Sequence, residues 1–526
     1  MSTEKKSLLL VFLLTLLSSI VYCQSINTDS KTARQVLASG NMRKAIKHYT
    51  ELLRVHENNT EYNAYIGYAY LNSRIDRSKA VEHFEKALKS PTADSYIYYD
   101  LGKAYMLCYR FDEAIEAFKN FQKKVDKEQE GDLTAQRYIE MCENAKTLIP
   151  LRSNVDIKNV GNNINSEFPD YNPYVDETES VMVFATKRDK NSPAVEDVDG
   201  FKTADIYISN FNGKEWEKPK RLPNTVNSSY VEESVGFSAD GNWLLITVDN
   251  QFGVDDIFIS EKVKKNFQKS EKLNINTEYK EHAAMLSPDG NWLFFSSNRP
   301  GGYGGYDIYY CKKLPNGEWS FPINAGNDIN TQYDDNFPYL APDGTTFFFA
   351  SQGHNSIGGY DLFKSTWDEE QQAFSTPDNL GFPVNTPDDN KTISVSKSGR
   401  YGYISDFREN GIGELDIYKV TFLDIPAPLY VATATLMTED STALTPETLS
   451  GKEYKIEVRD AASRSIIGTY RPNIHNAKFS IVLNSGFYIF DFYINNVKKN
   501  SFEYTIDDRE PIGDNLNLDI ILKQDD

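Results

Sequence analysis

Five aspartates with a regular spacing are the first residues to consider for chemistry. Each opens the same short motif, in which the aspartate is followed by Ile or Leu and then by Tyr or Phe. The five are Asp205, Asp256, Asp307, Asp361 and Asp416. Carboxylates could line a ligand site, but one in every copy of a repeat is better explained by a hydrogen bond that each copy needs for its own fold. The sequence therefore predicts a structural role for these aspartates.

Two histidines stand near acidic residues and could belong to an acid-base pair. His282 follows Glu281, and His354 lies in a turn before Asp361. The chain has only six histidines, and it contains no Gly-x-Ser-x-Gly, His-Glu-x-x-His or phosphate-loop motif. A lone histidine beside an acid is usually a hydrogen-bonding residue. We therefore predict a protein that is not an enzyme, with no catalytic, cofactor-binding or metal-binding residues.

The irregular segment 189–203 contains Asp197-Val198-Asp199-Gly200. This run slightly resembles a calcium-binding loop, but it lacks the downstream glutamate that would bind the ion with both oxygens. An exposed loop is the prediction.

Cysteines and tryptophans offer little further chemistry. Beyond Cys23 only Cys108, Cys142 and Cys311 remain, at spacings that match neither a metal site nor a disulfide scaffold. Cys108 and Cys142 could meet across packed helices, although buried free thiols are the favoured interpretation. The tryptophans are Trp216, Trp243, Trp292, Trp319 and Trp367. They fall at equivalent places of one repeat region, where packing explains them more simply than stacking on a carbohydrate.

The charge and the N-terminus indicate the compartment. The formal net charge is −20, from 76 acidic and 56 basic residues, and it disfavours binding to nucleic acid or to an anionic membrane surface. Lys5 and Lys6 precede an apolar run, 8–22, that is shorter than the roughly 20 residues of a membrane span. This layout predicts a signal peptide over residues 1–23 and an exported, periplasmic protein.

Cys23 leaves a second interpretation of the N-terminus open. It stands where a lipoprotein would carry its lipid, but the residue before it, Tyr22, is bulky where that signal has a small residue. Association with the outer membrane is therefore expected only through partners or through a lipid on Cys23.

Residues 24–150 predict a helical domain with a repeat of ~34 residues. Small and aromatic residues recur at matching places: Gly40, Ala45 and Tyr49; Gly67, Tyr70, Ala80, Phe84 and Ala87; Gly102, Tyr105, Ala114 and Phe118. Small residues let antiparallel helices approach, and the rings fill the gaps beside them. A last helix over Ala135–Leu148 is expected to point Tyr138, Ile139 and Met141 inward. Tyr96, Tyr98 and Tyr99 fit packing and ligand contact equally well.

Residues 151–424 predict a five-bladed β-propeller. Ile or Val, then Asn, then Ser or Thr occurs five times, starting at Ile164, Val226, Ile275, Ile329 and Val384, in phase with the aspartate motif. Tight turns such as Ser287-Pro288-Asp289-Gly290 precede strands such as 292–297, which are apolar on both faces and suit a blade packed between two others. The segment 155–161 resembles an outer strand and is expected to complete the last blade.

Residues 425–526 alternate as short strands at 429–435, 454–458, 466–470, 479–483 and 488–494. This pattern predicts a compact β-sandwich. The whole chain is therefore expected to be multidomain: an all-α solenoid, a five-bladed β-propeller and a C-terminal β-sandwich.

The motifs quoted above carry three resemblances. The helical repeats resemble the tetratricopeptide family. The third propeller copy, from Ser287 through Asn298-Arg299-Pro300-Gly301-Gly302 to Asp307-Ile308-Tyr309, resembles the WD-like repeats of TolB-type proteins. The strands from Tyr454 to Tyr488 look like a carboxypeptidase regulatory-like domain.

The order of these modules resembles the PorE-type periplasmic proteins of type IX secretion and gliding motility. In that family an OmpA-like peptidoglycan-binding domain follows, whereas this chain ends at Asp526, so that anchor is not expected. The resemblance implies a non-catalytic scaffold without a cofactor, which binds envelope proteins through its helical groove and a propeller face. The alternative is a propeller that binds a glycan or a peptidoglycan fragment.

Overall fold

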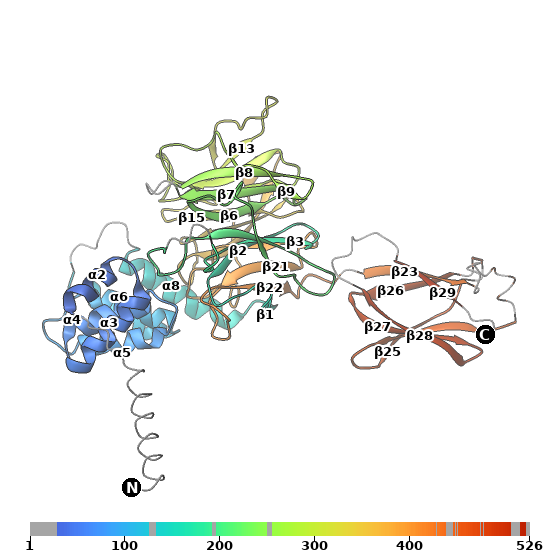
Figure 1. The fold of residues 1–526 in the computed structure, drawn as a ribbon, viewed down its shortest axis with the longest axis horizontal. Helices are drawn as coiled ribbons and strands as arrows, with labels where there is room; N and C mark the ends of the chain where they lie inside the picture. The colour runs from blue at the N-terminus through green and yellow to red at the C-terminus, as the bar shows by residue number, and fades with distance from the viewer. Residues whose placement is uncertain are drawn as a thin grey trace, which may run out of the picture.

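The computed structural model describes residues 29–521 except 126–132, 192–195, 250–254, 428, 438–444, 446, 448, 450, 474, 477 and 507–515. The predicted signal peptide and Cys23 lie outside the described residues. Among the helices that are described, none is long and apolar enough to cross a membrane. Figure 1 shows three parts in chain order: the helices in blue and cyan, the stacked sheets in green to orange, and a separate pair of sheets near the C-terminus.

The helical region contains three antiparallel helix pairs and a last helix. Its elements are α2 (Ser30–Ala38), α3 (Met42–Val55), α4 (Thr60–Leu71), α5 (Arg77–Ala87), α6 (Tyr96–Leu107), α7 (Phe111–Gln122) and α8 (Ala135–Leu148). Side chains cap several N-termini: Asp29, Asn41, Asn59 and Thr134 accept a hydrogen bond from a first-turn N–H. Consecutive helices pack against one another along the row, so each pair buries the apolar face of its neighbour.

Glycines set the closest approach within two of the helix pairs. A Cβ atom on Gly67 of α4 would lie 2.8 Å from the ring of Phe84 on α5, and one on Gly102 of α6 would lie 2.7 Å from the ring of Phe118 on α7. No real Cβ contact is that short, so a larger residue would push each pair apart. The packing role predicted for these glycines is confirmed.

The middle of the chain is a β-propeller. In the described residues its sheets have the orders β2-β3-β4-β5, β6-β7-β8-β10, β11-β12-β13-β14, β15-β16-β17-β18 and β20-β21-β22-β1, with β9 beside β8 and β19 beside β17. The innermost strands are β2 (Asp170–Val175), β6 (Val231–Phe237), β11 (Glu281–Leu286), β15 (Asp335–Leu340) and β20 (Ile393–Val395). Apolar side chains of neighbouring sheets share one core, as expected of blades packed on both faces.

The other strands complete the blades. The second strands are β3 (Val181–Thr186), β7 (Trp243–Asp249), β12 (Trp292–Ser297), β16 (Thr346–Ser351) and β21 (Tyr401–Asp406). The third strands are β4 (Asp205–Asn210), β8 (Asp255–Val263), β13 (Asp307–Lys312), β17 (Asp361–Asp368) and β22 (Asp416–Phe422). The outer strands are β5 (Lys220–Arg221), β9 (Asn266–Phe267), β10 (Glu271–Lys272), β14 (Ile323–Asn324), β18 (Ala373–Phe374), β19 (Asp378–Asn379) and β1 (Val155–Asn159).

The ring closes as the sequence predicted. Strand β1 pairs antiparallel with β22, with Val155 opposite Phe422 and Asn159 opposite Tyr418. The first strand of the propeller therefore supplies the outer strand of the last blade, and the open edge that an incomplete blade would expose is covered.

The repeated asparagines join each blade to the next. The Asn276 side chain accepts the N–H of Ile257 at 2.7 Å and donates to the carbonyl of the same residue at 2.7 Å. The same pair of bonds recurs for Asn227 with Ile206, Asn330 with Ile308, Asn385 with Leu362 and Asn165 with Ile417. Each asparagine thus satisfies two buried backbone groups of the preceding blade, and Asn165 does so across the ring closure.

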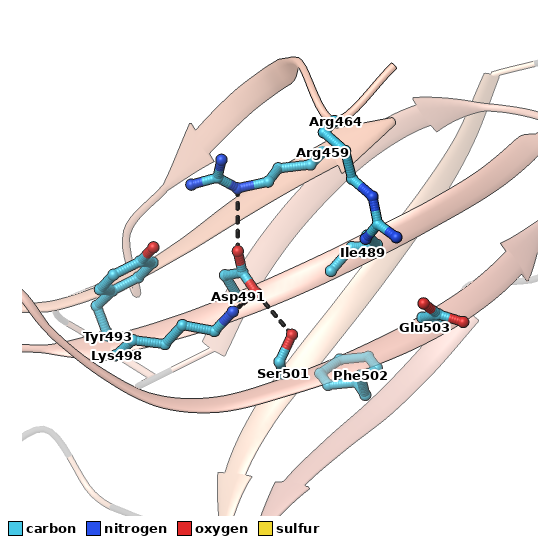
Figure 2. Close-up of a pocket in the computed structure, with 9 residues that line it drawn as sticks. All are labelled: Arg459, Arg464, Ile489, Asp491, Tyr493, Lys498, Ser501, Phe502 and Glu503. Carbon is cyan, nitrogen blue, oxygen red and sulfur yellow. Dashed lines mark hydrogen bonds and ion pairs between the residues drawn. The ribbon is translucent and has the colours of Figure 1, made fainter. Parts of the chain in front are cut away.

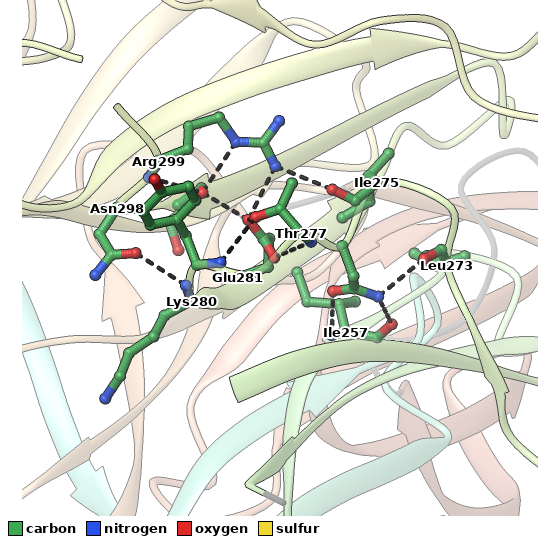
Figure 3. Close-up of polar contacts among 12 residues, drawn as sticks. Ile257, Leu273, Ile275, Thr277, Lys280, Glu281, Asn298 and Arg299 are labelled. Atoms are coloured by element: carbon green, nitrogen blue, oxygen red, sulfur yellow. Dashed lines mark hydrogen bonds and ion pairs between the residues drawn. The ribbon is translucent and has the colours of Figure 1, made fainter. Parts of the chain in front are cut away.

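A side-chain oxygen near the start of each inner strand adds further bonds, from a carboxylate in four blades and from an asparagine amide in the fifth. In the third blade Glu281 accepts hydrogen bonds from the Thr277 N–H at 2.8 Å and from the Arg299 guanidinium at 3.0 Å, and Arg299 also donates to the Ile275 carbonyl at 3.0 Å. Figure 3 shows Glu281 between these two partners. Its position is taken by Asp170, Glu232, Asp335 and Asn390 in the other blades.

The C-terminal region, residues 429–521, is a pair of packed sheets. One sheet holds β26 (Lys478–Asn484), β23 (Leu429–Met437) and β29 (Leu516–Ile521); the other holds β25 (Ile466–Tyr470), β24 (Tyr454–Asp460), β27 (Gly486–Ile494) and β28 (Val497–Ile506). Phe479 and Ile481 of the first sheet share a core with Ile456 and Phe490 of the second. Strands β28 and β29 were not predicted. In β28 most side chains are exposed and polar, so the apolar alternation is weak.

Candidate binding site between the helices and the propeller

The five repeated aspartates hold the blades together. Asp307 accepts the N–H groups of Tyr303 at 2.6 Å and Gly304 at 2.9 Å, and the side chain of Asn324 on the outer strand at 2.8 Å. Asp361 and Asp416 bind the loop before them and an outer-strand asparagine in the same way. In the first two blades Arg221 and Lys272 pair with Asp205 and Asp256. In the third, fourth and fifth blades the aspartate therefore ties its own loop to the outer strand, and in the first two it pairs with a cation on that strand.

The two histidines have different partners from those that their sequence neighbours suggested. Nδ1 of His282 lies 3.2 Å from Oδ2 of Asp255. Burial disfavours the charged form of Asp255, but the hydrogen bond and charge of His282, together with the charge of Lys280, outweigh it and lower the pKa of that carboxyl. Nε2 of His354 lies 2.9 Å from the carbonyl oxygen of Ile329, and burial lowers the pKa of the ring. Both rings are hydrogen-bonded, as predicted for each.

The loop that resembles a calcium site is built around an ammonium group. Nζ of Lys187 lies 2.7 Å from Oδ2 of Asp197 and 2.5 Å from Oδ2 of Asp199. Val198 is 67% exposed, as expected of an exposed loop, and other residues of the same loop contact the helical region. Glu196 pairs with Lys44 at 2.5 Å, and the Arg43 guanidinium stacks over the Phe201 ring at 4.8 Å.

Arg137 of α8 is the main link between the helices and the propeller. It is only 5% exposed, and its guanidinium donates to the carbonyl oxygens of Gln352 and Gly353 at 2.8 Å and of His354 at 3.2 Å. It also lies over the Tyr333 ring, 4.7 Å from the centroid. Several carbonyl dipoles and an aromatic face thus stabilise one buried cation in the fourth blade.

The turns within the three helix pairs meet the same propeller face. At the first, Arg43 donates through Nε to Glu414 at 2.9 Å. At the second, Arg77 pairs with Asp388 at 2.5 Å. At the third, the Tyr109 ring contacts the Phe382 ring with centroids 6.2 Å apart. One edge of the helical region therefore docks on the loops of the first and fifth blades, while α8 docks on the fourth.

Two neighbouring cavities lie in this junction. One, of about 350 Å³, lies between the ends of α4 and α6, the start of α8 and the loops of the fourth and fifth blades. The other, of about 380 Å³, lies at the propeller mouth and is lined by residues of all five blades. Asn72, Arg74 and Asp389 line both cavities. Each volume falls in the ~300–1,000 Å³ range of ligand sites.

Polar and charged side chains line part of the mouth cavity, and several of them are bound to one another. The Tyr171 hydroxyl donates to Glu233 at 2.7 Å, and burial raises the pKa of this tyrosine. Burial disfavours the charged form of Asp389, but the Lys391 ammonium at 3.0 Å and the Tyr360 N–H at 3.1 Å outweigh it and lower the pKa of that carboxyl. The site can therefore offer fixed donors and acceptors to a polar ligand.

A third, shallow pocket of about 620 Å³ lies on the outward face of the C-terminal sheet. Figure 2 shows Asp491 at its centre, bound by Arg459 at 3.0 Å and Ser501 at 2.6 Å. Lys498 adds an ion pair at 2.5 Å. The central carboxylate is already fully bound by neighbouring side chains, so this pocket is a weaker candidate than the junction.

The structure confirms the predicted inward positions of Tyr138, Ile139 and Met141. The burial of Arg137 was not predicted. A signal was present, because Arg137 stands four residues before the fully buried Met141 and so places a charge on an apolar helix face. Arg74, Arg77 and Asp388 carry no such signal. Their partners come from parts of the chain about three hundred residues away.

The comparisons with known proteins give structural likenesses only. No protein-family model and no curated protein matches this chain. Solved structures that match include a protein described as TolB from Agrobacterium tumefaciens, at 15% identity, covering 51% of this chain and 98% of that one, with a TM-score of 0.28. An endo-arabinase from Bacteroides thetaiotaomicron matches at 13% identity, covering 48% and 93%, with a TM-score of 0.30.

A third match is CoXyl43, a β-xylosidase/α-arabinofuranosidase from a compost metagenome, at 12% identity, covering 55% of this chain and 96% of that one, with a TM-score of 0.32.

Proposed function

We propose that this protein is a non-catalytic scaffold of a bacterial cell envelope, which binds other envelope proteins at the junction of its helices and propeller. The observation that carries the proposal is the docking of Arg137 on three backbone carbonyls of the fourth blade. Such a fixed contact makes the helices and the propeller one binding unit, with a cleft that neither part would form alone.

The finer part of the proposal rests on the resemblance of the sequence to PorE-type proteins. On this basis the helical pairs are of the tetratricopeptide kind, the protein is periplasmic, and its partners belong to a type IX secretion or gliding apparatus. Contact with the outer membrane would come through these partners or through a lipid on Cys23.

Affinity purification of the tagged protein from its own cells, followed by mass spectrometry, tests this proposal. We expect secretion or gliding components to co-purify with the full chain and to be lost when residues 31–149 are deleted. A second variant, Arg137→Ala, keeps both parts and loosens only their junction, and Arg110→Ala at an exposed turn is the matched control. If no envelope protein co-purifies with the full chain, the scaffold proposal is wrong.

A second candidate function is binding of a glycan or a peptidoglycan fragment. The polar cavity at the propeller mouth favours it, because Tyr171, Glu233, His282 and Phe337 come from four blades and face one space. A ligand that binds only the folded state raises the free energy of unfolding, by about 2.7 kcal/mol when its concentration is 100 times its Kd. The melting temperature rises with it. The measurement is the Tm of the protein with muropeptides and with neutral oligosaccharides. An unchanged Tm with both classes of ligand would exclude this candidate function.

A further inference from the structure

Arg74 lies among aspartates that are each bound more closely by another cation. Three aspartates surround it, and each has a cation of its own: Asp388 pairs with Arg77 at 2.5 Å, Asp389 with Lys391 at 3.0 Å, and Asp406 with Arg408 at 2.8 Å. Arg74 forms only a longer ion pair, 3.8 Å from its Nε to Oδ2 of Asp388, which Arg77 binds more closely.

The Nε–H group of Arg74 donates no hydrogen bond to any described residue. Its Nε lies 3.8 Å from Oδ2 of Asp388, which is beyond hydrogen-bond distance. This nitrogen is buried and has no hydrogen-bond partner among the described residues. The Arg74 side chain is nevertheless 30% exposed, so a ligand can reach it.

The surroundings of Arg74 offer apolar contact on one side. In the cavity beside the helices, Leu71, Met106, Leu107 and Leu133 line the same space as Arg74. The mouth cavity mixes polar side chains with the apolar Phe337 and Leu415. A ligand that fits both must carry an anionic group at the level of Arg74, with an apolar part toward the helices.

We propose that this composite cleft binds an extended acidic peptide segment of a partner protein, whose carboxylate pairs with Arg74 while apolar side chains lie against α4 and α6. A carboxylate accepts two parallel N–H bonds from a guanidinium, and Arg74 makes no such bond to Asp388, whose Oδ2 lies 3.8 Å from its Nε. The carboxylate comes from an Asp or Glu side chain or from a chain terminus. This inference rests on the proposed scaffold function and names the chemistry of the partner.

Selection of a random-peptide library, displayed with free C-termini, against the full chain tests the inference. We expect enriched peptides to contain a carboxylate next to apolar residues. Synthetic copies should bind roughly 10- to 100-fold more weakly to Arg74→Gln than to the natural protein, and equally well to Arg110→Gln, an exposed arginine at the next turn that lines neither cavity.

Amidation of the peptide terminus and replacement of its Asp or Glu by Asn or Gln distinguish the two sources of the carboxylate. The inference is overturned if no peptide is enriched, if enriched peptides lack acids, or if Arg74→Gln binds them as well as the natural protein does. An unchanged melting temperature of Arg74→Gln shows that folding is intact. If envelope partners still co-purify with Arg74→Gln, the scaffold proposal stands and only the peptide site is lost.

Discussion

Arg137 of α8 donates a 2.8 Å hydrogen bond to the carbonyl oxygen of Gln352, a residue 215 positions further along the chain. The helices and the fourth propeller blade are joined at this point by a cation that is almost fully buried. The same guanidinium binds two further carbonyls and stacks on Tyr333, so its loss affects several contacts at once.

Replacing this arginine should uncouple the helices from the propeller. Arg137→Ala leaves buried carbonyl oxygens without a donor, and we expect a loss of about 2–3 kcal/mol from the junction. Differential scanning calorimetry should then resolve a separate unfolding transition of the helices. The control Arg110→Ala should leave the calorimetric trace as in the natural protein, and an unchanged trace for Arg137→Ala would mean that the junction does not depend on this residue.

Removing the asparagine at the ring closure should weaken the whole propeller. Asn165→Ala removes the acceptor of the buried Ile417 N–H and one of two donors to its carbonyl, which also accepts the Val160 N–H. This should lower the free energy of unfolding by about 1–3 kcal/mol. Urea denaturation followed by tryptophan fluorescence measures this change. The exposed Asn266 serves as the matched control, because Asn266→Ala should shift stability by less than about 0.5 kcal/mol.

Asp335 should make the propeller less stable as the pH rises. Burial raises the pKa of its carboxyl to about 7, against the opposing hydrogen bonds from Ser351 and Thr331. Between about pH 4 and pH 7 the folded protein therefore holds a proton that the unfolded chain has lost, and stability falls as the pH rises through this window. Above pH 7 this contribution is constant.

The variant Asp335→Asn should flatten that part of the curve and stabilise the protein at pH 8. The fifth blade offers the precedent, because Asn390 occupies the equivalent position and accepts the same bonds from Thr386. The turn residue Asp343 provides a control of opposite sign. Burial opposes its ionisation, but bonds from Thr346 lower its pKa, so Asp343→Asn should change stability only toward acidic pH. Chemical denaturation at a series of pH values measures both, and parallel curves for Asp335→Asn and the natural protein would refute the assignment.

The helix pairs should be sensitive to one added methyl group. Gly102→Ala places a Cβ atom 2.7 Å from the Phe118 ring, and we expect a net destabilisation of about 1–3 kcal/mol despite the higher helix propensity of alanine. A double variant with Phe118→Leu should recover part of this loss, because the smaller side chain yields to the methyl group. Thermal unfolding monitored at 222 nm by circular dichroism reports both. Simple additivity would show that the two residues do not interact.

The sequence by itself determined the blade repeats and the closure of the ring. The asparagine and aspartate motifs recur because every blade must satisfy the same backbone groups, so Asn276 and Asp307 stand for their counterparts in the other blades. The packing of neighbouring helices also followed from the sequence, because Gly102 and Phe118 stand at repeated positions and lie in contact. Such signals are local or periodic, and a single sequence carries them.

Only the tertiary structure decided the binding cleft. Arg74 lies in the turn between α4 and α5 and Arg137 in α8, while their surroundings, Asp388 and Gln352, belong to blades more than two hundred residues later. Neither contact repeats, so no period marks it, and each exists only after two separately folded parts have docked. The long ion pair of Arg74 likewise depends on Asp388 being bound more closely by Arg77, and that pairing is a property of positions in space.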